Sequence, residues 1–152
     1  YLLIRDYRAN KCEDQVDFLG KTYLIQEEAP KYKWKILNEI KEIQGYLCMK
    51  AETVDTVKDN IIHAWFTDAI PVYGGPEGYS GLPGMILEIS VNETDVVVTA
   101  VKVDLKGSKV DLPKPKRMKG KEITRTVLHS QMKEFIAERI EGRKNPYWEV
   151  RF

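Results

Sequence analysis

Histidine, cysteine and long apolar runs are scarce in this sequence, and each scarcity excludes a class of protein. The 152 residues include two histidines and two cysteines, too few for a disulfide framework. No apolar run approaches the roughly 20 residues that a membrane-spanning helix needs. The charges nearly cancel, because 24 basic residues face 23 acidic ones, and this balance gives no overall attraction to nucleic acid. We therefore expect a single globular domain over residues 1–152.

The start of the chain has the pattern of a strand and not of a leader. Residues 1–6 are largely apolar, and the first residue is Tyr1 instead of methionine. We expect that a signal peptide, and with it the first strands, precedes Tyr1 in the unprocessed protein.

Extended patterns fill most of the chain before residue 106. Alternating apolar and polar residues predict strands at residues 1–6, 32–37, 46–54, 61–67, 85–91 and 96–105, and a hairpin over residues 16–25. The hairpin is expected to turn at Leu19-Gly20. Residues 38–43 fit a strand or a helix, and the strand is preferred. In the strand at 85–91, one core face is expected from Met85, Leu87, Ile89 and Val91.

A helix is predicted after these strands. Thr124 is a suitable N-cap and Gly142 a suitable end. The apolar stripe between them consists of Leu128, Met132, Phe135, Ile136 and Ile140. A last strand is expected at residues 147–152. The order of elements predicts a mainly β (α+β) fold, an antiparallel bent sheet or open barrel with one amphipathic C-terminal helix.

Residues 106–121 differ in charge from the rest of the chain. They contain seven basic residues and one acid, Asp111. We interpret them as a basic loop or linker to the C-terminal helix. Two alternatives stay open: a solvated loop, or a contact with acidic lipid head groups, lipopolysaccharide phosphates or an acidic protein patch.

Residues 71–84 form a loop rich in glycine and proline, with five glycines and three prolines in fourteen positions. Such a loop follows one defined path, because proline fixes φ and glycine permits close backbone approach. Tyr73 and Tyr79 are therefore held on a stiff scaffold, as interface anchors often are. The predicted partner-binding residues are Tyr73, Gly75, Pro76, Tyr79, Gly81, Leu82, Pro83 and Gly84. The alternative is that both tyrosines lie on the sheet and close its end.

No set of residues has the spacing of a catalytic site. Only His63 and His129 could supply an imidazole, and Gly-x-Ser-x-Gly is absent. We expect no enzyme activity and no cofactor. A soft-metal site of copper type at Cys48 and His63 is a weaker alternative, and a disulfide between Cys12 and Cys48 stays open.

Several separated blocks resemble the GLPGLI family. The blocks are residues 34–36, 45–51, 64–71, 75–76 and 81–87, with Met85 where the family name has leucine. The resemblance implies a secreted envelope protein of Bacteroidetes-type bacteria, often encoded near outer-membrane transporters, with no known activity. On this basis we expect a non-catalytic binding module, periplasmic or associated with the outer membrane, whose partner is an outer-membrane transporter or another envelope protein. A copper-type metal protein and a lipid or small-molecule carrier are the alternatives.

Overall fold

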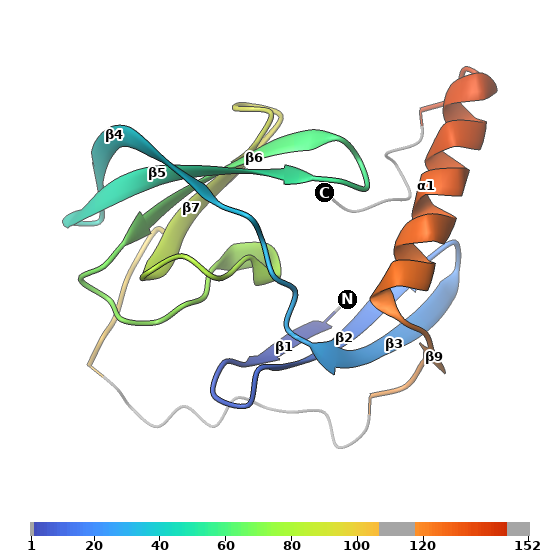
Figure 1. Ribbon diagram of the computed structural model, residues 1–152, viewed down its shortest axis with the longest axis horizontal. Helices are drawn as coiled ribbons and strands as arrows, with labels where there is room; N and C mark the ends of the chain where they lie inside the picture. Colours follow the sequence, from blue (N-terminus) through green and yellow to red (C-terminus); the bar gives the residue numbers. More distant parts are fainter. Residues whose placement is uncertain (1, 107–117, 146–152) are drawn as a thin grey trace.

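Two β-sheets and one long helix make up residues 2–106 and 118–145, the part of the chain that the computed structural model describes (Figure 1). The predicted fold class, mainly β with one C-terminal helix, is confirmed. The strands divide between two sheets, where the sequence predicted one bent sheet. In the described residues, no helix is both long and apolar enough to cross a membrane.

The first sheet has the strand order β1-β2-β3-β9. Its strands are β1 (Leu2–Asp6), β2 (Lys11–Phe18), β3 (Lys21–Glu28) and the short β9 (Lys121–Glu122). The pairs are antiparallel except for β3 with β9, which is parallel. The predicted hairpin turn is confirmed, since Leu19 and Gly20 both have positive φ, 50° and 71°.

The second sheet is an antiparallel meander in sequence order. Its strands are β4 (Lys35–Ile43), β5 (Tyr46–Asp55), β6 (Asn60–Thr67), β7 (Met85–Val91) and β8 (Val96–Thr99). The preference for a strand at residues 38–43 is confirmed. The last strand is shorter than predicted, because it ends at Thr99 and not near residue 105.

Strand β7 buries both of its faces, so the single core face predicted for it is wrong. Ile86 and Leu87 are each 2% exposed and belong to two different apolar clusters. Successive side chains of a strand point to opposite faces, and the pairing of β6 with β7 also shifts register between Trp65 and Phe66. The central strand is therefore covered on both sides.

Helix α1 (Arg125–Glu141) packs on the first sheet (Figure 1). Its predicted ends are confirmed, because the Thr124 hydroxyl accepts a hydrogen bond from the Val127 amide at 3.3 Å and Gly142 caps the last turn. Leu128 and Ile136 are buried against this sheet, and each such burial stabilises the fold by about 1.5–3 kcal/mol. Ile140, the last member of the predicted stripe, is instead 58% exposed.

Two predictions lie outside the described residues. They are the strand at residues 147–152 and most of the basic segment 106–121.

Candidate functional site

The glycine- and proline-rich loop of the second sheet lies against the first sheet. It contains the one-turn 3-10 helix η1 (Pro76–Gly78) and connects β6 to β7. A Cβ atom on Gly74 would lie 2.4 Å from the Tyr7 hydroxyl, and one on Gly78 would lie 2.6 Å from Arg5 Nη2. The loop backbone thus lies directly against side chains at the β1 end of the first sheet, and Gly78 also has a positive φ of 79° that favours glycine.

Only part of the predicted partner-binding loop is available at the surface. Tyr73 is 57% exposed, and Gly81 and Pro83 are exposed as well. Leu82 is 2% exposed and belongs to the core of the second sheet. Gly84 is buried with φ 149°, and a Cβ there would lie 2.0 Å from the Thr67 carbonyl oxygen. Leu82 and Gly84 are thus structural residues, which corrects their place in the predicted contact surface.

The remaining members of the predicted loop site, Gly75, Pro76 and Tyr79, are half-buried. A Cβ on Gly75 would lie 2.5 Å from Ile86 Cβ, so this glycine is required for packing on β7. Tyr79 faces inward, and its ring is 4.9 Å from that of Tyr32 and 6.2 Å from that of Trp34. The alternative in which the tyrosines close the end of the sheet therefore holds for Tyr79 and not for the exposed Tyr73.

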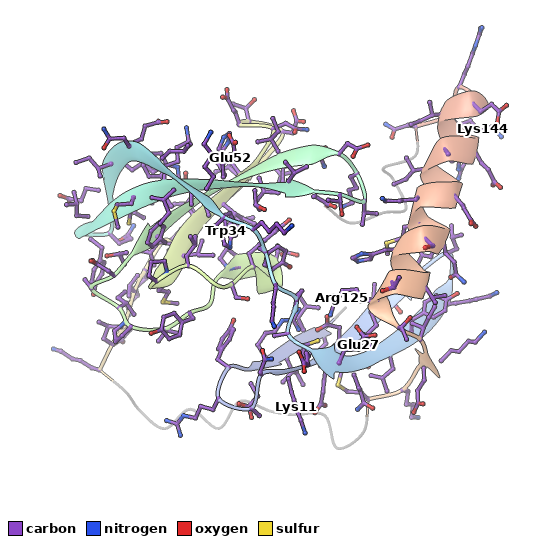
Figure 2. All side chains as sticks on the ribbon, in the orientation of Figure 1. Lys11, Glu27, Trp34, Glu52, Arg125 and Lys144 are labelled. Carbon is purple, nitrogen blue, oxygen red and sulfur yellow. The ribbon has the colours of Figure 1, made fainter. Side chains whose placement is uncertain are left out.

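A cleft of ≈ 790 Å³ opens between the two sheets and the beginning of α1. Its walls come from β1 and β2, residues 30–35, the end of β5 with the turn that follows it, the loop at Glu77 and Tyr79, and one face of α1. Figure 2 shows Arg125 and Glu27 together at the first turn of the helix, Glu52 on the other sheet, and Lys144 at the far end of the helix. This volume is in the range of small-molecule binding sites.

One wall of the cleft is aromatic. Tyr32 and Tyr79 both line it, and Trp34 supports them from behind, 6.0 Å from Tyr32 between ring centroids. The indole N–H of Trp34 donates to the Ser80 carbonyl at 2.8 Å, which fixes the ring against the loop. Residues 29–34, which connect the two sheets, are thus held against the glycine-rich loop.

The floor of the cleft is an ion-pair network. Asp14 on β2 is 0% exposed and accepts from Arg5 on β1, through both guanidinium Nη atoms, and from Arg125 on α1. Arg125 Nη2 lies 2.7 Å from Asp14 Oδ2 and 3.1 Å from the Cys12 sulfur. Charge-assisted bonds of this kind are the strong ones, so the network fixes the helix to the first sheet at its N-terminal end.

Burial shifts the pKa of several groups around the cleft. It lowers the pKa of Lys58 and of His129, and it raises the pKa of Tyr32, because a low-polarity environment disfavours the charged form. The positive charge of Arg125 adds to the lowering at His129. Burial also opposes the charge of Arg125 itself, but the hydrogen bond and charge of Asp14 outweigh burial and raise the pKa of Arg125. The cleft is consequently a partly desolvated environment.

The residues proposed for a metal site do not meet. His63 on β6 is paired with Glu52 on β5, at 3.2 Å between Nε2 and Oε2. Cys48 lies four residues along β5 from Glu52, or about 13 Å in an extended strand, and its thiol is packed among apolar side chains. Among the described residues, no group of three histidine, cysteine, aspartate or glutamate side chains could hold a metal ion.

The disulfide left open by the sequence is not formed. Cys12 and Cys48 are both buried free thiols. They belong to different sheets, Cys12 to β2 and Cys48 to β5. Cys12 contacts Arg125, whereas burial among apolar neighbours raises the pKa of Cys48.

Within residues 2–106 and 118–145, neither histidine forms part of a hydrolase triad. Glu52, His63 and Ser90 are cross-strand neighbours on β5, β6 and β7. Only the Glu52–His63 pair is hydrogen-bonded, since no bond joins Ser90 to His63 in the described residues. His63 and Ser90 are each 7% exposed and do not line the cleft. His129 does line it, without a bonded nucleophile among the described side chains.

Sequence reasoning missed the residues of the cleft floor, Arg5, Asp14 and Arg125. One signal was present, because Asp14 alternates with Cys12 and Val16 on the inward face of β2. A carboxylate at such a position is rarely buried without a partner. The identity of its partners depends on how the helix meets the sheet.

Comparison with known proteins finds a matching family and similar solved structures. The family sequence model described as N-glycanase peptide, N-terminal domain (PNGase F-II N) matches residues 22–126. Two solved structures of PNGF-II are among the matches. The structure in space group P21 has 22% identity and a TM-score of 0.46, and the match covers 64% of this chain and 19% of that chain. The structure in space group C2 has 19% identity and a TM-score of 0.49, with 84% and 23% covered.

The chain thus spans about a fifth of the length of these structures. No curated protein sequence matches it. The GLPGLI-like blocks fall inside the range matched by the family model, and that resemblance stays a prediction that these comparisons do not test. Because the family match covers more than half of the 152 residues, the chain belongs to the family of N-glycanase N-terminal domains.

Proposed function

We propose that this chain is a non-catalytic binding module that holds a glycan in the cleft between its two sheets. The observation behind the proposal is the open cleft of ≈ 790 Å³ with Tyr32 and Tyr79 on one wall. Aromatic rings on a rigid wall offer a flat apolar surface with a hydroxyl at its edge, which suits the faces and hydroxyl groups of a sugar ring. Membership of a family named for an N-glycanase favours an N-linked glycan as the ligand.

Calorimetric titration of N-linked glycopeptides into the chain tests this proposal. Tyr32→Ala removes one ring of the aromatic wall. It is expected to weaken glycan binding by about tenfold, because one aromatic contact with the sugar is lost. Tyr73→Ala is the matched control, because Tyr73 is 57% exposed on the loop and does not line the cleft. Thermal unfolding of both variants verifies that they are folded. The proposal fails if the chain binds no glycan, or if the two variants weaken binding equally.

A second candidate is the protein interface that the sequence predicted on the loop. Its supporting observation is that Val72 and Tyr73 are 44% and 57% exposed side by side on a loop held at both ends. An envelope protein such as an outer-membrane transporter stays the proposed partner, and a periplasmic or outer-membrane location stays a prediction.

The Tyr73 variant also separates the two candidates. Cross-linking in intact envelopes should capture a transporter with the native chain and with Tyr32→Ala, but not with Tyr73→Ala. Capture that is unchanged in Tyr73→Ala would remove the loop interface from consideration while leaving the glycan proposal intact.

A further inference from the structure

The ion-pair network at the cleft floor has an excess of positive charge. Two guanidinium groups share the single carboxylate of Asp14, so the three side chains sum to one positive charge. The side chains of Asp14 and Arg5 are 1% and 8% exposed. Water therefore screens this charge poorly, and a buried charge without a counter-charge is costly. A ligand that supplies a negative group to the floor would remove this cost.

The walls of the cleft carry as many acidic residues as lysines: Asp17, Glu52, Asp55 and Glu77 against Lys31, Lys33, Lys35 and Lys58. Glu52 is paired with His63, Asp17 accepts from the Thr22 hydroxyl at 2.6 Å, and Asp55 accepts from the amides of the turn that follows it. None of these contacts neutralises the arginine pair. The excess charge of the floor is thus not balanced by the walls that surround it.

Arg125 is the member of the network that a ligand can reach. Its side chain is 21% exposed and lines the cleft. In the described residues its guanidinium bonds through Nη2 alone, to Asp14 and Cys12, which leaves the Nη1 and Nε donors. Arg5 Nε is also buried without an acceptor. The arginine pair therefore offers more donors than the protein supplies acceptors, and a planar guanidinium fits a carboxylate or a sulfate.

The position of Arg125 in the helix adds to this preference. It is the first residue of the 17-residue helix α1, where the aligned peptide dipoles place a partial positive charge. Its own backbone amide is already used, since it donates to Glu27 Oε1 at 3.0 Å. The guanidinium, and not the helix terminus, is therefore the group that would contact an anion.

Aromatic and cationic groups meet at the same place in the cleft. Tyr32, Arg5 and Arg125 all line the cleft, and the ring of Tyr32 lies 4.9 Å from that of Tyr79 between centroids. We infer that the cleft selects acidic saccharides, with the sugar ring against Tyr32 and its carboxylate or sulfate on Arg125. This inference rests on the proposed glycan-binding function and names its ligand class.

A comparison of matched saccharides tests the inference. Sialyllactose offers a carboxylate, lactose sulfate offers a sulfate ester, and lactose is the neutral reference. In calorimetry at low ionic strength, the affinity for at least one of the acidic sugars should exceed the affinity for lactose by about tenfold or more. This factor corresponds to one charge-assisted hydrogen bond. Comparison of the two acidic sugars shows which oxyanion the site takes.

Arg125→Gln should abolish the preference for acidic sugars over lactose, because the remaining Arg5–Asp14 pair is neutral. Lys144→Gln removes a positive charge at the opposite end of the helix and should change nothing (Figure 2). If Arg125→Gln does not fold, competition by sodium sulfate against the native chain replaces it. Sulfate should displace the acidic sugars, and sodium chloride at equal ionic strength should not.

The outcomes separate this inference from the function on which it rests. Equal affinity for acidic and neutral sugars overturns the acidic preference but leaves glycan binding standing. If the preference for acidic sugars survives in Arg125→Gln, or if sulfate does not displace those sugars, Arg125 is not the group that binds the anion. Failure to bind any of the sugars, together with failure to bind glycopeptides, overturns both.

Discussion

Removal of the Asp14 carboxylate is the perturbation whose effect the structure defines best. In Asp14→Ala, Arg5 and Arg125 would face each other without a counter-charge, with side chains that are 8% and 21% exposed. Breaking a buried ion pair from one side costs about 3–5 kcal/mol. Arg125 can turn part of its guanidinium toward the cleft, so we expect the lower half of this range. Domains are stable by about 5–15 kcal/mol, and the variant should still fold in the absence of denaturant.

Glu39→Ala is the matched control for this prediction. Glu39 also pairs with a basic residue, Lys50, at 3.1 Å, but its side chain is 54% exposed. An exposed pair of this kind contributes about 0–1 kcal/mol. Urea unfolding, monitored by circular dichroism, gives the free energy of unfolding of each variant. The two values are compared at equal slopes of free energy against urea concentration. If Asp14→Ala costs no more than Glu39→Ala, the argument from buried charge is wrong, and with it the basis of the acidic-ligand inference.

Three further predictions concern the loop, the thiols and the helix. Gly84→Ala should destabilise the fold by about 2–5 kcal/mol, from strain at positive φ together with the clash with β6, whereas Gly45→Ala, with open space around it, should cost about 1–2 kcal/mol in urea unfolding. Cys12 and Cys48 should react with Ellman's reagent only after denaturation and give two thiols without reductant; a native disulfide would give none. His129 should destabilise the fold as the pH falls below about 6.5, its unfolded pKa, because burial lowers its folded pKa and the unfolded state then binds the proton more readily. The difference in stability between the native chain and His129→Gln should accordingly shrink or reverse on acidification, and a constant difference would refute the shift.

The structure gives the glycine-rich loop a role that the sequence did not predict. The sequence indicated a shaped loop and offered two roles for it, a contact surface and a cover for the sheet. The structure gives it a third role, because Gly74 and Gly78 lie against Tyr7 and Arg5 of the first sheet. The loop thereby contacts the first sheet, and Tyr79 within it forms part of a wall of the cleft.

Local patterns were sufficient for most of the elements. The Leu19-Gly20 turn, the capping of α1 by Thr124 and the strand at residues 38–43 follow from turn chemistry, capping and alternation, which are properties of neighbouring residues. The errors are of another kind. The buried Ile86 and Leu87 on opposite faces of β7, and the exposed Ile140 on α1, depend on which surface each element meets.

The sequence by itself determined the fold class, the turns and the ends of the helix, because these depend on periodicity and on residues close together in the chain. Only the tertiary structure decided the site. Arg5, Asp14 and Arg125 are brought together across two strands and a helix, with more than one hundred residues between Asp14 and Arg125. No local pattern encodes such a meeting, because it arises from the way in which α1 packs on the first sheet. The separation of the two cysteines into different sheets, and the presence of Tyr32 in the same cleft as the arginines, were decided in the same way.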